Sequence, residues 1–374
     1  MLHRKLLVAN RGEIAIRILR AANELGMQTV AVYSEDDARC LHRSCADESV
    51  ALRGRGAAAY LDAEQLVAAA RELNCDALHP GYGFLSEHAE FARRCEAAYV
   101  HFVGPKPATL ELLGDKTRAR ALARELGVPV LAGTQVAASL ADAESFFTSL
   151  PAGTAMLIKA AFGGGGRGMR VVRKRDELAD AYERCRSEAG AAFGDDSVYC
   201  EQFIERARHV EVQIVGDRMG AVTHLWEREC SLQRRHQKLV EIAPAPGLPS
   251  AVRERLLHWS LELARAAHYE NVGTFEFLLD VSRPNEPIAP VFIEANPRLQ
   301  VEHTVTELVT GVDIVQLQLH LAAGMSLSEL ELTNPAQTRP RGFAIQARIN
   351  MEAMDAAGVA RPSAGVLTTF EVPT

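Results

Sequence analysis

Apolar residues in the first third of the chain alternate between short continuous runs and helical spacing. An apolar run over residues 5–10 is followed by apolar positions three to four residues apart over 14–25, and a second run covers 29–33. This pattern predicts a strand, a helix and a second strand. The alternation continues with helices predicted over 61–73 and 86–98 and strands predicted over 76–79 and 100–103. It is typical of an α/β unit built on a parallel sheet.

The turn after the first predicted strand bears on which ligand such a unit could bind. It reads Asn10-Arg11-Gly12-Glu13 and lacks the G-x-G-x-x-G spacing that lets a pyrophosphate approach the backbone. We therefore expect a Rossmann-like fold that does not bind a dinucleotide, and an oxidoreductase is disfavoured.

A glycine-rich segment lies between two short apolar runs in the middle of the chain. The runs cover 156–160 and 169–172, and the first contains Lys159. The glycines between them are Gly163, Gly164, Gly165, Gly166 and Gly168. No Gly-Lys-Ser/Thr follows, so this is not a Walker A loop. A flexible linker is the alternative, but two apolar strands around such a loop favour a hairpin flap that closes over phosphate oxygens.

Two carboxylates lie inside otherwise apolar predicted strands. Glu276 is flanked by apolar residues over 273–279, and Glu294 occupies the same kind of position over 290–296. If the two strands form a hairpin that is symmetric about Asn285, Glu276 and Glu294 face each other, with Asn296 on the same face. Facing carboxylates repel unless a cation lies between them, and an oxygen-only ligand set suits Mg²⁺ bound with phosphates. The alternative is a solvated pair of glutamates.

Polar residues continue every second position beyond the second strand, at Arg298, Gln300 and Glu302. Pro297 should end the strand, which places these side chains on a loop. Upstream, residues 227–238 form a second dense polar run. Such a run is usually a solvated surface, but beside a nucleotide flap and a metal pair it predicts a small anionic co-substrate next to ATP.

Composition limits the remaining classes of function. A chain of 374 residues is long enough for two or three domains. It carries 41 Lys and Arg against 48 Asp and Glu, a formal charge of -7, so we expect no nucleic-acid partner. No apolar stretch reaches the roughly 20 residues of a membrane span, and we expect a cytoplasmic protein without a membrane partner. The seven Cys are scattered without a C-x-x-C pair, which favours buried free thiols.

Five of these segments together resemble one enzyme family. Residues 10–15, 79–87, 163–168, 227–238 and 294–302 are similar to biotin carboxylase, the ATP-grasp component of biotin-dependent carboxylases. The resemblance implies an α/β and α+β fold in three parts. These are a Rossmann-like pre-ATP domain over 1–114, an ATP-grasp domain over 115–330 with a glycine-rich lid at about 132–203, and the start of a C-terminal β domain over 331–374.

The resemblance also implies a role for individual residues. The implied ATP-binding set is Lys116, Lys159, the five glycines, Glu201, Gln202, Phe203, Ile204, His209, Gln233 and His236. Mg²⁺, or Mn²⁺ in its place, would be held by Glu276, Glu294 and Asn296. Bicarbonate would be bound by Lys238, Arg298, Gln300 and the backbone of Val301. Glu302 would act as the base, Arg348 would stabilise the biotin enolate, and Tyr82 would flank the biotin ring.

The implied reaction is ATP-dependent carboxylation of biotin on a carrier domain, through carboxyphosphate. Departures from the family pattern bear on the parent enzyme: 342–348 reads Gly-Phe-Ala-Ile-Gln-Ala-Arg, where His and Glu are expected. Gln346 and residues 348–352 favour an acyl-CoA carboxylase, whereas Ile242 is typical of pyruvate carboxylase; a urea carboxylase is a further alternative. The implied partners are a biotin carboxyl carrier domain and a carboxyltransferase, on the same or on separate chains.

The family further implies a homodimer or higher oligomer, with Arg17, Arg20 and Glu24 of the first helix at the contact. A solvated charged face is the alternative. We also expect the third domain to be incomplete after a strand at 366–372, and residues 1–374 to be part of a longer polypeptide. A chain with the full C-terminal domain should bind nucleotide more tightly than these residues alone.

Two other function classes remain open. A carbamoyl-phosphate synthetase half would pass carboxyphosphate to ammonia and would leave Arg348 without a purpose. A nucleotide sensor could lose Lys238 or Glu302, but both are present.

Overall fold

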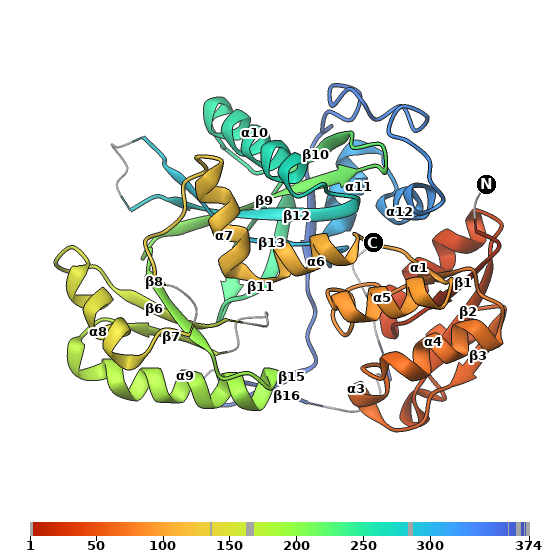
Figure 1. The fold of residues 1–374 in the computed structure, drawn as a ribbon, viewed down its shortest axis with the longest axis horizontal. Helices are drawn as coiled ribbons and strands as arrows, with labels where there is room; N and C mark the ends of the chain where they lie inside the picture. Colours follow the sequence, from red (N-terminus) through yellow and green to blue (C-terminus); the bar gives the residue numbers. More distant parts are fainter. Residues whose placement is uncertain are drawn as a thin grey trace.

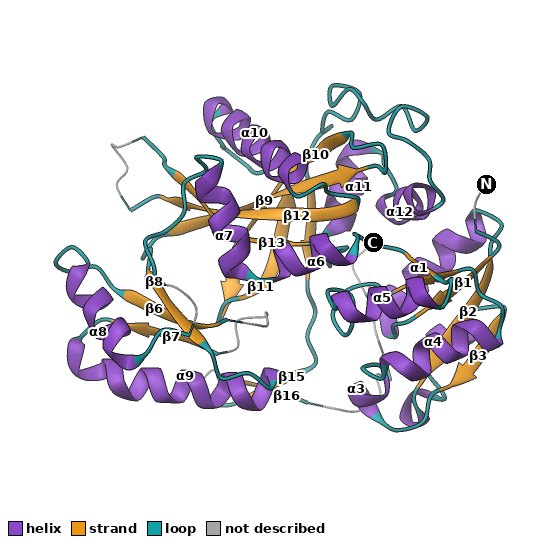
Figure 2. Ribbon diagram, viewed as in Figure 1, coloured by secondary structure: helices purple, strands orange, loops and turns teal. Residues whose placement is uncertain are grey.

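The computed structural model describes residues 3–134, 137–161, 168–282, 287–357, 359–363, 368–369 and 371. It contains a five-stranded sheet, a six-stranded sheet, a three-stranded sheet and a two-stranded one. The five-stranded and six-stranded sheets form separate units that lie side by side, and the three-stranded sheet lies below the six-stranded one (Figures 1 and 2).

The N-terminal unit is the predicted parallel α/β sheet. Its strand order is β3-β2-β1-β4-β5. The strands are β1 (Lys5–Val8), β2 (Gln28–Tyr33), β3 (Glu48–Ala51), β4 (Ala77–His79) and β5 (His101–Phe102). The longer helices are α1 (Gly12–Glu24), α4 (Ala63–Glu72) and α5 (Ala89–Ala97), and short ones are η1 (Glu35–Asp37), α2 (Leu41–Ser44) and α3 (Gly56–Ala59). The edge strand β3 was not predicted, because most of its residues are exposed and it shows no apolar run.

Two predicted helices begin later than expected, since polar side chains cap them. The Asp62 side chain accepts a hydrogen bond from Gln65 N at the start of α4, and His88 accepts one from Phe91 N at the start of α5. A capping residue has extended backbone and lies outside the helix. The helix predicted from residue 86 therefore starts at Ala89.

The three-stranded sheet contains the predicted hairpin. β6 (Met156–Ala160) pairs antiparallel with β7 (Met169–Val172) and with β8 (Val198–Gln202). The helices α8 (Leu140–Ser149), η2 (Arg175–Glu177) and α9 (Leu178–Phe193) accompany it, and α6 (Pro107–Gly114) and α7 (Lys116–Glu125) connect it to the N-terminal unit. Gly163, Gly164, Gly165 and Gly166 lie outside the described residues; Gly168 is described, with φ +64°.

The six-stranded sheet has the order β13-β12-β9-β10-β11-β14. Its strands are β9 (Ala207–Gly216), β10 (Val222–Arg234), β11 (Gln237–Ala243), β12 (Asn271–Asp280), β13 (Pro290–Asn296) and β14 (Ala344–Ala347). Helix α10 (Ser250–Ala266) packs against β9 and β10 over a core that includes Phe275, Phe277 and Phe292. The helices α11 (His303–Thr310) and α12 (Ile314–Ala322) follow β13.

The C-terminal segment is only partly as expected. Its first strand, β14, pairs with β11 and so extends the six-stranded sheet. A short hairpin of β15 (Glu352–Met354) and β16 (Ala360–Pro362) comes next. Most of the strand predicted over 366–372 lies outside the described residues, and its described residues 368, 369 and 371 are not in a strand.

Two composition-based expectations can be compared with the structure. All seven Cys are free, as predicted, but Cys40 is exposed and Cys45 is half-buried, so the expectation of burial was wrong for these two. Within the described part of the chain, no helix is both long and apolar enough to cross a membrane.

Candidate functional site

Four charged side chains form a row across the six-stranded sheet. Arg228 on β10 pairs with Glu211 on β9, Glu211 pairs with Glu276 on β12, and Glu276 pairs with Glu294 on β13. Directly paired residues of antiparallel strands project to the same face. The row therefore gathers three carboxylates and one guanidinium on one face of the sheet.

The predicted opposition of Glu276 and Glu294 is confirmed, although the hairpin is not fully symmetric. The register shifts immediately after the pair, where Phe277 lies opposite Phe292. Such an irregularity alters the local twist of the ladder without changing which face the two glutamates share. The alternation of apolar and acidic positions was therefore sufficient to find this part of the site.

Only part of the polar run at 227–238 is a solvated surface, since Arg235, His236 and Gln237 are exposed. Most of it belongs to β10, in which Glu227, Arg228 and Glu229 are buried. After a turn, β11 brings Lys238 opposite Gln233. The two strands thus carry charged side chains from the edge of the sheet into its centre.

The ammonium of Lys238 joins three carboxylates. Lys238 Nζ donates to Glu211 Oε2 at 2.5 Å, to Glu302 Oε1 at 2.7 Å and to Glu276 Oε1 at 3.1 Å. Burial alone would lower the pKa of Lys238, but the charges of Glu211 and Glu276 raise it well above its usual value. Lys238 therefore carries a positive charge at neutral pH.

Glu276 is held in its ionised form. His209 Nε2 lies 2.6 Å from Glu276 Oε2, and Asn296 Nδ2 donates to Glu276 Oε1 at 2.6 Å. Burial raises the pKa of Glu276, but the charges of Lys238 and His209 outweigh it and lower the pKa to about 2. Gln233 Nε2 lies 2.8 Å from His209 Nδ1, so two residues of the predicted nucleotide set lie beside the predicted metal pair.

The other end of the row faces the lysines predicted to bind phosphate. Lys116 Nζ lies 3.4 Å from Glu294 Oε2. Burial raises the pKa of Glu294, and the charges of Lys116 and Lys159 lower it by more, so its net shift is downward. Lys159 forms an ion pair with Glu201, which also pairs with Arg120. Both predicted phosphate lysines are therefore placed near the carboxylates.

The loop after β13 carries the predicted anion-binding groups. Arg298 pairs with Glu87, donates from Nη1 to Gln300 Oε1 at 3.1 Å and from Nη2 to Asn296 Oδ1 at 3.1 Å. Gln300 Nε2 donates to Thr274 Oγ1 at 3.0 Å. Glu302 is almost fully buried at the start of α11. These contacts link the loop to the metal pair through Asn296.

Arg348 reaches the same centre from the edge of the sheet, where β14 pairs with β11. It follows β14, and its Nη2 donates to Glu302 Oε2 at 2.9 Å. Its Nε donates to Glu241 Oε1 at 2.6 Å, and Gln346 Nε2 donates to Glu241 Oε2 at 3.4 Å. The unusual Gln346 thus contacts the carboxylate that holds Arg348.

Several predicted residues make their contacts outside the group of side chains around Lys238. Tyr82 is half-buried, its carbonyl accepts a hydrogen bond from Asn10 Nδ2, and it packs against the core beside α1. His236 lies in the turn between β10 and β11, and burial followed by the charge of Lys159 lowers its pKa. The predicted adenine hinge, Glu201 to Ile204, runs from the end of β8. The roles of these residues, and that of the half-buried Val301, stay predictions.

The sequence interpretation missed residues that support the predicted ones. Four of them contact a predicted site residue directly, namely Glu211, Glu241, Arg120 and Glu87. Arg228 contacts Glu211. Glu211 carried the same signal as Glu276, namely a single carboxylate in an apolar strand, and could have been found. Arg120 lies on a helix of ordinary charge pattern, so only its buried contact with Glu201 marks it.

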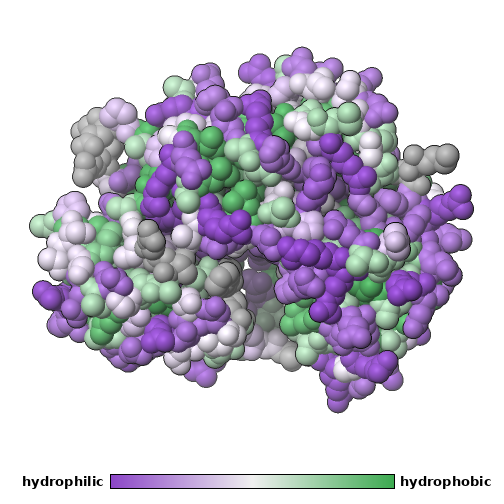
Figure 3. Space-filling view, in the orientation of Figure 1, coloured by the Kyte–Doolittle hydropathy of each residue, from purple (hydrophilic) through white to green (hydrophobic). Residues whose placement is uncertain are grey.

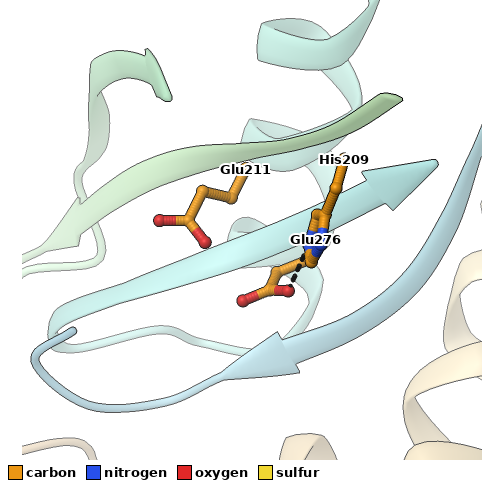
Figure 4. Close-up of side chains that lie close together, drawn as sticks. All are labelled: His209, Glu211 and Glu276. Atoms are coloured by element: carbon orange, nitrogen blue, oxygen red, sulfur yellow. Dashed lines mark hydrogen bonds and ion pairs between the residues drawn. The ribbon is translucent and has the colours of Figure 1, made fainter. Parts of the chain in front are cut away.

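The predicted metal ligands fit a divalent cation by their chemistry. Glu276 and Glu294 are both shifted toward the ionised form, and Asn296 adds an amide beside them. Such oxygen donors suit Mg²⁺. Figure 4 shows a second grouping, in which His209, Glu211 and Glu276 offer ligand atoms within 4.8 Å of one another. Lys238 already contacts both of these carboxylates, so this grouping holds an ammonium.

The surface is hollowed between the N-terminal unit and the three-stranded unit. In Figure 3 a deep opening separates these two lobes below the six-stranded sheet. Lys159, on β6 of one lobe, and Glu87, in the other lobe, both belong to contact networks of the site. The opening therefore lies between two units that both contribute residues to the candidate site.

Two family models match the chain. One, described as the N-terminal domain of biotin carboxylase, matches residues 2–110. The other, described as the ATP-binding domain of the carbamoyl-phosphate synthase L chain, matches residues 115–330. Together they cover the α/β unit and the sheet that carries the row of charges.

Individual relatives agree with the family models. Pyruvate carboxylase of Aspergillus niger is 52% identical over 356 residues, which is 94% of this chain and 29% of that protein. Human mitochondrial pyruvate carboxylase is 50% identical over 371 residues, 98% of this chain and 31% of that protein. The chain thus spans about a third of the length of these curated relatives.

A solved structure shares the fold over nearly the whole chain. It is the biotin carboxylase domain dimer of Hydrogenobacter thermophilus 2-oxoglutarate carboxylase with MgADP, ADP and bicarbonate, at TM-score 0.89 and 42% identity. The match covers 94% of this chain and 76% of that one. The fold, the order of the motifs and these relatives agree, and the chain belongs to the biotin carboxylase family of ATP-grasp enzymes.

Proposed function

We propose that this chain catalyses the ATP-dependent carboxylation of biotin by bicarbonate, as the biotin carboxylase part of a pyruvate carboxylase-type enzyme. The observation that carries the proposal is the position of Lys238, whose Nζ contacts both Glu276 and Glu302. Glu276 belongs to the proposed metal pair and Glu302 is the proposed base. One ammonium therefore joins the phosphate side of the reaction to the bicarbonate side.

The nucleotide would be bound by the cations at the Glu294 end of the row. Lys116 and Lys159 would neutralise phosphate oxygens, and His209, Gln233 and His236 would lie near the ribose and phosphates. Glu276, Glu294 and Asn296 would hold Mg²⁺, which when bound stabilises the charge that develops on the transferred phosphate. The buried Glu201 would keep Lys159 in place before ATP arrives.

Bicarbonate would bind between Lys238, Arg298 and Gln300, with the Val301 backbone as a further donor. Glu302 would take the proton of bicarbonate, and the freed oxygen would attack the γ-phosphorus in line as ADP leaves. The product is carboxyphosphate. The ion pair of Arg298 with Glu87 supports this role, because it fixes the guanidinium at the start of the loop.

The second half of the reaction would use the phosphate that the first half produces. Carboxyphosphate would break down to CO₂ and phosphate, and phosphate would take the N1′ proton of biotin. The resulting enolate would attack CO₂ while Arg348 stabilises its oxygen. Arg suits this task because its guanidinium is planar and always charged. The contact of Arg348 with Glu302 supports a position beside the bicarbonate site.

The parent enzyme was predicted as an acyl-CoA carboxylase, and the relatives do not support that preference. They are named pyruvate carboxylases and favour the alternative. A biotin carboxyl carrier domain and a carboxyltransferase would be the partners, and the domain dimer of the Hydrogenobacter thermophilus relative supports a homodimer. At the predicted contact, Arg17 pairs with Glu307 and Asp313 of its own chain. The cytoplasmic location stays a proposal, since three of the relatives are named as mitochondrial.

ADP release in the presence of bicarbonate and Mg²⁺ tests the proposed function. Addition of free biotin should stimulate it. Stimulation by ammonia in place of biotin would favour a carbamoyl-phosphate synthetase reaction. Nucleotide binding without turnover under any of these conditions would favour a sensor.

A further inference from the structure

Asn10 lies directly after β1, where the sheet of the N-terminal unit changes direction. In the order β3-β2-β1-β4-β5, the chain adds strands on one side of β1 and then on the other, so the ends of β1 and β4 border a switch point. Ligands of open α/β sheets bind next to such a point. We infer that Asn10 is a positioning residue that fixes the loop 80–87 after β4 as one wall of the biotin site. This inference rests on the proposed carboxylation of biotin and on the predicted place of Tyr82 beside the biotin ring.

The side-chain amide of Asn10 holds the backbone of the loop. Its Nδ2 donates to Pro80 O at 2.7 Å and to Tyr82 O at 2.9 Å, and its Oδ1 accepts from Arg11 N at 2.9 Å. Asn10 is only 3% exposed. Gly81, between the two acceptors, has φ +65°, and a Cβ there would lie 2.8 Å from Asn10 Nδ2. The loop backbone therefore packs directly on the amide.

A second contact holds the loop in a strained conformation. Phe84 has φ +43°, which is unfavourable for a bulky side chain and persists only where the surroundings impose it. Its ring stacks on Tyr60 with 5.2 Å between centroids, and the Arg11 guanidinium lies over both rings. Asp37 Oδ2 accepts from Arg11 Nη1 at 3.0 Å and from Tyr60 OH at 2.7 Å. The loop is thus fixed at both Tyr82 and Phe84.

The loop and the turn after β1 face two arginines of the proposed site. Glu87, at the end of the loop, pairs with Arg298 of the bicarbonate set. Glu13 lies in the first turn of α1, near enough to feel the charge of Arg348: desolvation raises the pKa of Glu13, and that charge opposes the rise. The loop that joins these two points therefore borders the space from which biotin would reach Arg348.

Loss of the Asn10 amide should loosen this wall without removing any proposed substrate contact. In Asn10→Ala the carbonyls of Pro80 and Tyr82 lose their donor. The Michaelis constant for biotin should rise about tenfold, the effect expected for two lost hydrogen bonds. The constant for MgATP should stay nearly unchanged, because Lys116 and Lys159 lie on α7 and β6, away from the loop.

Two further variants separate positioning from stability. Gly81→Ala disturbs the same contact from the loop side and should also raise the biotin constant, which keeps the inference testable if Asn10→Ala does not fold. Thr29→Val is the matched control, because Thr29 is a fully buried polar residue of the same unit, and its hydroxyl donates to Asp47 Oδ2 at 2.8 Å. Thr29 pairs with Leu6 near the start of β1, at the other end of the strand from Asn10.

Steady-state formation of carboxybiotin from free biotin, with melting temperatures recorded in parallel, decides the question. A raised biotin constant with a normal MgATP constant in Asn10→Ala and Gly81→Ala, but not in Thr29→Val, supports the inference. In a Tyr82→Ala background, Asn10→Ala should raise the biotin constant little further.

Three results would each overturn the inference. They are an unchanged biotin constant in Asn10→Ala and Gly81→Ala, an equal rise in Thr29→Val, and independent effects of the changes at Asn10 and Tyr82. A failure of the proposed function is distinct, since the unchanged protein would then form no carboxybiotin, and the inference would fall with it.

Discussion

Glu276 and Glu294 occupy paired positions on β12 and β13, yet each carboxylate is held by a different lysine. Lys238 Nζ lies 3.1 Å from Glu276 Oε1, and Lys116 Nζ lies 3.4 Å from Glu294 Oε2. Both carboxylates are shifted toward the ionised form by these charges. The pair therefore connects the proposed bicarbonate site at one end to the proposed phosphate site at the other.

Replacement of Glu294 by Gln should lower bicarbonate-dependent ATP turnover by roughly 100-fold, the order lost when one electrostatic stabiliser of a transition state is removed. Nucleotide affinity should change far less, since the metal acts chiefly on charge that develops during transfer. ADP release at saturating Mg²⁺ and calorimetry with a non-hydrolysable ATP analogue measure the two effects. Near-normal turnover would remove Glu294 from the metal pair.

Replacement of Arg348 by Ala should separate the two half-reactions. Arg348 is proposed to act on biotin, so the biotin-stimulated rate should be lost while a slow bicarbonate-dependent ATPase remains. Because Arg348 also contacts Glu302 Oε2 at 2.9 Å, a small fall in the ATPase rate is consistent with this role. An equal fall of both activities would show that Arg348 is structural or shared between the steps.

Glu241 should matter only through Arg348. It is fully buried, and burial raises its pKa, while the charge of Arg348 opposes the rise. Glu241→Gln keeps the shape but weakens the ion pair, so the biotin-stimulated rate should fall about tenfold, with less effect on the ATPase. In an Arg348→Ala background, Glu241→Gln should lower the biotin-stimulated rate little further. Additive losses of rate in this double-mutant cycle would show that Glu241 does not act through Arg348.

The N-terminal unit should depend on pH through Asp37. Burial raises the pKa of Asp37, but hydrogen bonds from Tyr60 and Arg11 lower it from 3.8 to about 2. A lowered pKa adds stability that is complete above the unfolded value and is lost as pH falls toward 2. Asp37→Asn should lower the free energy of unfolding at pH 7 by about 1 to 2 kcal/mol, allowing for screening by water.

Thermal unfolding of Asp37→Asn and the unchanged protein between pH 7 and pH 3 checks this expectation. The difference between the two should shrink below pH 4. Glu35→Gln, at an exposed neighbouring carboxylate, serves as the control and should show little difference at any pH. A difference that stays constant with pH would mean that packing, and not charge, explains the effect.

The parts of the fold that periodic patterns encode were predictable. The parallel sheet, the β6–β7 hairpin and the opposition of Glu276 and Glu294 all follow from the spacing of apolar residues. The exposed edge strand β3 has no such pattern. The starts of α4 and α5 are set by single capping side chains, Asp62 and His88, which the spacing of apolar residues does not reveal. These features depend on local hydrogen bonds that a hydrophobic pattern does not record.

The candidate site was predictable only as far as its residues share a motif. Lys238, Arg298 and Glu302 were found from their motifs, whereas Arg228 was read only as one member of a polar run. Its burial arises because β9 and β10 pair in a register that places it opposite Glu211. Register between strands distant in sequence is a property of the assembled sheet, so the contact between Glu211 and Lys238 could not be derived from spacing along the chain.

Transfer of labelled carbon from bicarbonate to free biotin tests the central claim most directly. With ATP and Mg²⁺ present, the chain should form labelled carboxybiotin, and Glu302→Gln should abolish this product while nucleotide still binds. ATP hydrolysis that depends on bicarbonate but leaves no label on biotin, or label transfer that is undiminished in Glu302→Gln, would contradict the proposed reaction.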